Sequence, residues 1–242
     1  MSLQVGIIGF GSFGQFAASA LAAHTAVVAW APGDIVPPPG VRAVTFKEVA
    51  AADVIILAIP LSAYEEVLGK LKPIVRSESL IVDVCSVKVR ARDELRRLLG
   101  GHPNVLITHP LFGPQSAANG TAGHDIIVTD AVGDLAERCV LFCEQTLGLR
   151  VTRISAEEHD RVMAYVHVLT FFVARGLRTM NIPELPFTTP SFSEIVDLIQ
   201  LDAKHSDELF RTIQQGNPYG DEVRRELVKV FEGLQRSLEL PQ

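Results

Sequence analysis

Three glycines near the start of the chain have the spacing of a phosphate-binding turn. Gly9, Gly11 and Gly14 form G-x-G-x-x-G between an apolar run at residues 5–8 and a segment with helical periodicity. Gly9 permits a tight turn, Gly11 lets the backbone approach a pyrophosphate, and Gly14 allows the helix to pack closely on the strand. The following helix N-terminus offers N–H groups to phosphates. A ligand-free turn is the alternative, but this context favours a dinucleotide bound along Gly9, Phe10, Gly11, Ser12, Phe13 and Gly14.

A histidine and a serine follow two of the buried apolar runs. His109 follows residues 105–108 and opens a loop rich in glycine and proline, while Ser86 follows residues 80–84. Beside a nicotinamide, an imidazole can take the proton of a substrate hydroxyl as the hydride leaves. A serine hydroxyl can bind a substrate oxygen, orient the histidine or cap the next helix. We predict that His109 and Ser86 are catalytic.

Other polar residues near these two are candidates for substrate contacts. Lys88 lies in the first turn of the helix after Ser86, where the helix dipole disfavours a cation. This position suggests a negative ligand nearby, although solvent exposure is the simpler interpretation. His159 and Asp160 open a later helix, as a cap and a surface charge or as part of the cleft. The predicted substrate contacts are Ser86, Lys88, His109, Gly113, Ser116, Asn119 and His159.

Strands alternating with helices as far as residue 152 predict the scaffold that positions these residues. The expected strands cover residues 27–30, 41–45, 54–59, 80–84, 105–108, 126–129 and 151–152, in addition to the first. This alternation is typical of an α/β fold with a doubly wound, mostly parallel sheet. Ligands bind at the carboxyl ends of such strands, so Pro60, Ser86 and His109 are expected at the ligand edge.

The second strand bears on the choice of cofactor. In this type of fold an acidic residue at its end holds the ribose 2′-hydroxyl of NAD. Here the strand runs into Ala31, and Asp34 comes three residues later. The missing carboxylate favours NADP without excluding NAD. We add Ala31, Ile59, Pro60 and Ser86 to the expected cofactor contacts.

The alternation of strands and helices ends at about Ser155. No strand signal returns, and helices are expected from Ser155 to about Leu177 and over residues 192–201, 206–215 and 221–238. We predict a dinucleotide-binding domain at residues 1–153 and a smaller all-helical domain at residues 154–242. The short helices carry so much apolar surface that we expect them to form a homodimer.

Composition excludes several classes of protein. The 242 residues are 48% hydrophobic and carry a net charge of −6, which argues against disorder and against nucleic acid as a partner. No apolar run can span a membrane, and no secretory signal is expected. The three cysteines lack disulfide or zinc spacing, so we expect reduced thiols, no metal site and a cytoplasmic protein.

Four segments together resemble one family. Residues 6–15, 82–88 (VDVCSVK), 108–114 (THPLFGP) and 158–160 (EHD) are similar to motifs of prephenate and arogenate dehydrogenases, especially the plant arogenate type. The resemblance implies a Rossmann fold and the oxidative decarboxylation of arogenate or prephenate, with hydride transfer to NAD(P), in tyrosine biosynthesis. It also implies that His109 accepts the hydroxyl proton and that Ser86 is its hydrogen-bonding partner in the site.

Two alternatives remain open at this point. A hydroxyacid or imine dehydrogenase is one, although residues 157–180 contain no lysine, which hydroxyacid enzymes carry in this helix. A non-catalytic nucleotide-binding relative is the other. In its favour, Phe171 stands where many relatives have a second histidine, and residues 189–193 lack the arginine of bacterial relatives.

Overall fold

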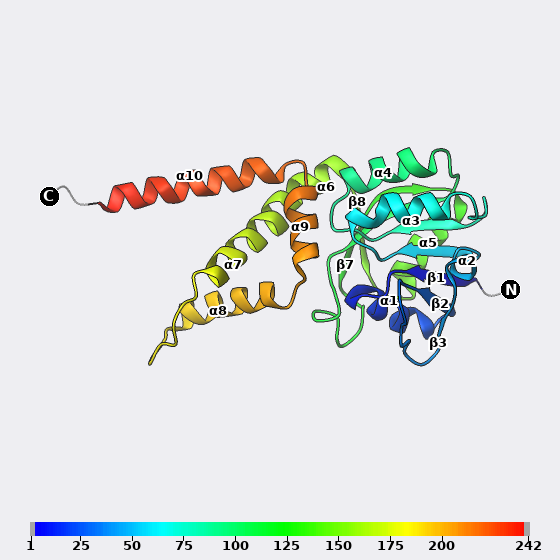
Figure 1. The fold of residues 1–242 in the computed structure, drawn as a ribbon, viewed down its shortest axis with the longest axis horizontal. Helices are drawn as coiled ribbons and strands as arrows, with labels where there is room; N and C mark the ends of the chain where they lie inside the picture. Colours follow the sequence, from blue (N-terminus) through cyan, green and yellow to red (C-terminus); the bar gives the residue numbers. More distant parts are fainter. Residues whose placement is uncertain (1–2, 240–242) are drawn as a thin grey trace. The chain divides into compact units, whose positions relative to one another are not determined.

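The structure, a computed structural model, describes residues 3–239. It divides within one helix, between His159 and Asp160, shortly after the predicted domain boundary at 153/154. Among the described residues, the strands all lie in the first unit and the second unit is helical (Figure 1). Within residues 3–239, no helix combines the length and apolarity that crossing a bilayer requires.

The sheet of the first unit has eight strands in the order β3-β2-β1-β4-β5-β6-β7-β8. Neighbouring strands from β3 to β6 run parallel, β7 is antiparallel to β6, and β8 is parallel to β7. The predicted doubly wound, mostly parallel sheet is therefore confirmed, with the chain order reversing between β1 and β4. The strands are β1 (Gln4–Ile8), β2 (Ala26–Trp30), β3 (Val41–Ala43), β4 (Val54–Leu57), β5 (Leu80–Asp83), β6 (Val105–Pro110), β7 (Asp125–Val132) and β8 (Arg150–Arg153).

Helices cover both faces of this sheet because alternate strand residues point to opposite sides. Ile8 and Ile55 belong to a core that includes residues of α2, α3 and α4, whereas Ile7 and Ile56 pack with residues of α1 and α5. Both faces are thus apolar, as expected for a parallel sheet. The helices of this unit are α1 (Ser12–Ala22), α2 (Phe46–Val49), the 3₁₀ turn η1 (Leu61–Ala63), α3 (Tyr64–Leu71), α4 (Val89–Leu99), α5 (Asp134–Gln145) and the start of α6 (Ala156–Met163).

A β-bulge interrupts the antiparallel pairing of β6 and β7. Ile107 is opposite Asp130 but Thr108 is opposite Val128, so Thr129 is the extra residue. The next residue of β6, His109, is opposite Ile127 and lies within the strand, not after it as predicted. Bulges re-aim the side chains beside them, and this one immediately precedes the predicted catalytic residue.

The helical unit confirms the predicted helices with one correction. After α6 the chain forms a π-helical segment, η2, where a continuous α-helix was expected. Its wider turn leaves the Val168 carbonyl to accept a 2.8 Å hydrogen bond from the Gln214 side chain, and Val168 packs with Phe171 and Ile213. The elements are η2 (Ala164–Leu169), α7 (Thr170–Thr179), α8 (Pro190–Ala203), α9 (Asp207–Gly216) and α10 (Gly220–Leu238).

Candidate active site

The glycine turn at the end of β1 has the shape of a phosphate cradle. Gly9 has a φ of +99°, and a Cβ there would lie 2.3 Å from the Ala58 carbonyl oxygen. A Cβ on Gly14 would lie 2.1 Å from the Gly9 carbonyl oxygen, whereas a Cβ on Gly11 would meet nothing within 4 Å. Two glycines therefore make the turn compact, and the third leaves its backbone open to a ligand. Gly11 is also the N-cap of α1 and leaves the first N–H groups without a side-chain acceptor.

The neighbouring strand ends line the same edge as this cradle. Ile59 contributes its Cγ2 atom 2.8 Å from where a Gly9 Cβ would lie, and Pro60 is the N-cap of η1. On the other side, the Gly9 N–H donates to the Trp30 carbonyl at 2.8 Å, which places the end of β2 and Ala31 beside the turn. These residues fit a dinucleotide. The open backbone at Gly11 lies at the N-terminus of α1, and the strand order of the sheet reverses beside it, between β1 and β4.

A buried charge network holds the carboxyl ends of β5 and β6 together. Asp83 and Lys88 are fully buried and form an ion pair. Asp83 also accepts hydrogen bonds from the Tyr64 hydroxyl and from the Cys85 N–H, the latter at 3.1 Å. Lys88 donates to the Thr108 carbonyl, and the Thr108 hydroxyl donates to the Asp83 carbonyl at 2.8 Å. Burial, followed by the nearby Asp83 charge, raises the pKa of Tyr64 well above its ordinary value.

This network corrects two sequence-based interpretations. The interpretation that Lys88 is exposed to solvent is wrong, because its side chain is fully buried and is paired with Asp83. A direct substrate contact by Lys88 does not fit this burial either. Ser86 does not cap the following helix, since α4 begins at Val89 after the N-cap Lys88. Ser86 instead lies half-buried in the turn between β5 and α4, on the edge where it was predicted.

His109 lies against a second histidine. Its Nδ1 atom is 2.9 Å from the Nε2 atom of His159, and the two ring planes are inclined by 71°. His109 is 3% exposed and His159 is fully buried. The structure therefore brings together two residues that were predicted separately, one catalytic and one a substrate contact.

The loop after β6 returns towards the cradle. The Phe112 ring lies 6.1 Å from the Phe16 ring of α1, measured between centroids. Within the loop, Ser116 accepts a 3.0 Å hydrogen bond from the Gly113 N–H and is exposed, as is Asn119. The strand of His109, β6, lies three strands from β1, about 14 Å at the usual strand spacing. Through Phe112, the loop after β6 contacts α1, the helix that follows the glycine turn.

Comparisons with known proteins agree with this geometry. Residues 40–138 match the family model described as "Prephenate dehydrogenase, nucleotide-binding domain". Arogenate dehydrogenase 2, chloroplastic, and arogenate dehydrogenase 1, chloroplastic, both from Arabidopsis thaliana, are 27% and 28% identical over 98% of this chain. The chain is thus similar to prephenate and arogenate dehydrogenases. It spans 70% of the length of the first of these proteins and 39% of the second.

A solved dehydrogenase of this group shares the fold. The prephenate dehydrogenase from A. aeolicus, crystallised with hydroxyphenyl propionate and NAD+, superposes with a TM-score of 0.72. The match covers 98% of this chain and 88% of that one at 21% identity.

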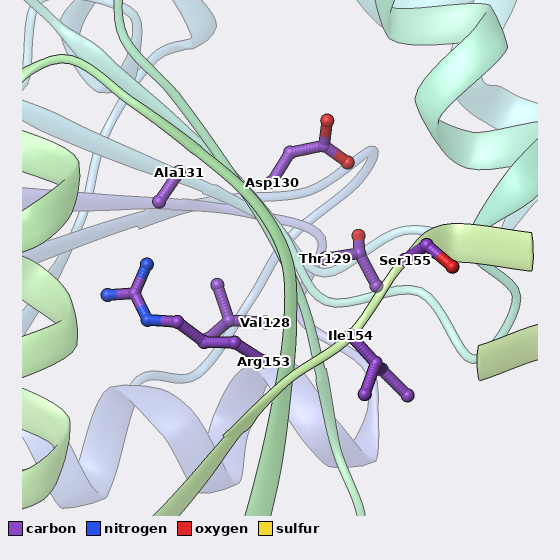
Figure 2. Close-up of a pocket in the computed structure, with 7 residues that line it drawn as sticks. All are labelled: Val128, Thr129, Asp130, Ala131, Arg153, Ile154 and Ser155. Carbon is purple, nitrogen blue, oxygen red and sulfur yellow. The ribbon is translucent and has the colours of Figure 1, made fainter. Parts of the chain in front are cut away.

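A cavity of about 350 Å³ lies outside the candidate active site, where β7 and β8 separate (Figure 2). Of the charged side chains that line it, Arg153 pairs with Glu137 at 2.6 Å and Asp130 with Arg96 at 3.1 Å. None of the predicted catalytic, cofactor or substrate residues lines this cavity. It therefore adds nothing to the site described above.

Sequence reasoning missed several residues that support the candidate active site. Asp83 is part of the motif at residues 82–88, but neither Asp83 nor Tyr64 is among the predicted site residues. The one local signal was an acid at a strand end, five residues before a lysine at a helix start. Arg92 of α4 was not singled out at all, yet it pairs with Glu157 at 2.7 and 3.0 Å and so anchors the start of α6.

Proposed function

We propose that this protein is an NAD(P)-dependent dehydrogenase that oxidises and decarboxylates arogenate or prephenate in tyrosine biosynthesis. One observation carries the proposal: the buried His109 is on the strand edge that also holds the glycine cradle. The motifs around Ser86 and His109 and the relatives named above support the choice of substrate.

The cofactor is held by the cradle. The residues proposed to contact it are Gly9, Phe10, Gly11, Ser12, Phe13, Gly14, Ala31, Ile59, Pro60 and Ser86. When bound, a nicotinamide accepts the hydride from the substrate carbon. We favour NADP, because Ala31 and not an acid follows β2, so no carboxylate repels a 2′-phosphate there.

The chain itself has little chemistry to perform. His109 accepts the proton of the ring hydroxyl as the hydride leaves, and Ser86 hydrogen-bonds the same oxygen. The ring carboxylate then departs as carbon dioxide, and its bonding electrons complete the aromatic ring. Aromatisation supplies the driving force, so positioning is the main task of the protein. Gly113, Ser116 and Asn119 are proposed to contact the substrate from the loop after β6.

We further propose a homodimer formed through the helical domain. Apolar side chains on α10 are 43–68% exposed, among them Phe231 and Leu234, and a second copy would cover them. We place the boundary of this domain near residue 153 and the protein in the cytoplasm, where the three cysteines stay reduced.

A single assay tests the proposed activity. Arogenate and prephenate are each supplied with NAD and with NADP, and the absorbance of the reduced nicotinamide is followed. We expect turnover with at least one substrate and a lower KM for NADP than for NAD. Absence of turnover in all four combinations, by protein that binds the nucleotide, would refute the activity and favour the non-catalytic alternative.

A further inference from the structure

The contact between His109 and His159 links the protonation of the two rings. A neutral imidazole has one N–H donor and one bare acceptor nitrogen. A hydrogen bond between two neutral imidazoles therefore holds a single proton between its nitrogens. The 2.9 Å separation of His109 Nδ1 and His159 Nε2 fits such a bond.

Both rings are held by structure on either side of the bond. The backbone N–H of His159 donates to the Ser155 carbonyl at 2.9 Å, and the Ser155 hydroxyl caps the same helix by accepting from the Glu158 backbone N–H. Glu157 ties this first turn to Arg92 of α4 through two hydrogen bonds. His109, in turn, follows the bulge in β6 and is paired with β7. Neither ring can easily leave the contact, because one is fully buried and the other nearly so.

We propose that His159 is a positioning residue, which keeps the His109 proton on Nδ1 so that Nε2 is the basic nitrogen offered to the substrate. The role of His109 Nε2 as a base rests on the proposed function, whereas the position of the proton on His109 Nδ1 does not. In the proposed arrangement His109 Nδ1–H donates to His159 Nε2, and His159 carries its own proton on Nδ1. The opposite polarity, with His159 donating, would put the His109 proton on Nε2 and remove the base.

The same bond assists the proton transfer. The hydroxyl proton of the substrate moves to His109 Nε2, and the O–H electron pair remains on the oxygen as the carbonyl forms. His109 becomes an imidazolium whose Nδ1–H still donates to a neutral acceptor. A hydrogen bond from a charged donor is roughly twice as strong as one between neutral groups, so His159 stabilises the charge that forms on His109. Elsewhere a carboxylate performs this task for a catalytic histidine; here a neutral imidazole does.

The variants His159→Gln and His159→Leu separate hydrogen bonding from packing. A glutamine amide oxygen can reach the place of Nε2 and accept the same proton, whereas leucine fills the space without an acceptor. A matched control is His102→Leu, which removes a partly buried imidazole that bonds to the Ser79 carbonyl near the opposite end of β6. Circular dichroism and nucleotide binding check that each variant is folded.

The tautomer is read directly by NMR of the full chain labelled with ¹⁵N in histidine, with the His109 signals assigned through His109→Gln. We expect the His109 proton on Nδ1 in the wild type, in His159→Gln and in His102→Leu. In His159→Leu we expect much of it on Nε2. A wild-type proton on Nε2, or the same tautomer with and without the acceptor, would overturn the inference. This measurement needs no turnover, and the wild-type spectrum decides even if His159→Leu does not fold.

Kinetics with the substrate that is turned over supply the second measurement. For His159→Leu we expect kcat to fall about 10- to 100-fold, a part of the 10²–10⁴-fold contribution of a general base, with KM within about threefold. His159→Gln should retain kcat within about fivefold, because it keeps the acceptor. Equal loss in both folded variants, or no loss in either, would contradict a positioning role. Lack of turnover in the wild type together with the expected tautomer would instead refute the proposed function alone.

Discussion

Two glycines of the cradle differ in what an added methyl group would meet, and this difference gives a sharp test of nucleotide binding. At Gly14 the new Cβ would lie 2.1 Å from the Gly9 carbonyl oxygen, whereas at Gly11 it would meet nothing within 4 Å. Gly11 also has a φ of −70°, which alanine adopts without strain. Gly11→Ala should therefore affect the ligand, and Gly14→Ala the fold.

The magnitudes follow from these contacts. In Gly14→Ala the turn must open by about 1 Å to restore an ordinary contact, and overpacking of this kind costs roughly 1–3 kcal/mol. For a chain of this size that lowers Tm by roughly 2–12 °C. In Gly11→Ala the poorer N-cap destabilises the protein, whereas the reduced freedom of the unfolded chain stabilises it. The two effects nearly cancel, so the free energy of unfolding should change by less than about 1 kcal/mol. Its methyl group occupies the space through which the pyrophosphate approaches, and we expect Kd to rise at least about tenfold, equivalent to about 1.4 kcal/mol.

Thermal unfolding and calorimetric titration with NAD and NADP measure the two effects. Gly69→Ala is the matched control, because its Cβ also meets nothing within 4 Å but lies on α3 away from the cradle. It should bind nucleotide as the wild type does. Unchanged affinity in Gly11→Ala would refute the assignment of the cradle, and an unchanged Tm in Gly14→Ala would refute the packing argument.

Four further predictions concern other parts of the chain. His109→Ala should lower turnover roughly a hundredfold or more while nucleotide binding persists; near-normal turnover would exclude His109 as the proton acceptor. Lys88→Met leaves the buried Asp83 without its cation and should cost about 3–5 kcal/mol in the free energy of unfolding, whereas an unfolding midpoint like that of the wild type in urea would contradict the buried pair. Partial burial raises the pKa of the Cys143 thiol to about 12, so at pH 8 very little of it is the reactive thiolate. Iodoacetamide should then label Cys143 slowly in the native protein and fully after unfolding, as mass spectrometry would show, and fast native labelling would count against the raised pKa. Phe231→Glu places a charge on the exposed face of α10 and should convert a dimer into a monomer in sedimentation at micromolar concentration; a wild-type protein that is already monomeric would rule out the dimer.

The parts of the fold that sequence reasoning predicted correctly depend on local patterns. Continuous apolar runs such as residues 54–57 gave the strands of the sheet, and the spacing of Gly9, Gly11 and Gly14 gave the turn at the end of β1. Spacing also placed Ser86 and His109 near the carboxyl edge, because parallel strands with helical crossovers all end on the same side.

The errors arose where a residue's surroundings come from distant parts of the chain. A lysine at a helix start is usually solvated, but Lys88 is buried, and one of its acceptors, the Thr108 carbonyl, is twenty residues away in the sequence. In the π-helical segment, the Val168 carbonyl likewise accepts a hydrogen bond from Gln214, which is 46 residues away. No periodicity within the local sequence encodes such partners.

The pairing of His109 with His159 shows how local and distant information combine at the site. Each histidine was noticeable alone, one after a buried strand and the other in the first turns of a helix, but 50 residues separate them. Two features support their contact: the bulge lies directly before His109, and the Arg92–Glu157 pair ties the first turn of α6 to α4. A change at either support should therefore alter catalysis through His109 without touching substrate or nucleotide. The chemistry of the site thus depends on the geometry of the whole first unit as well as on the motifs that revealed it.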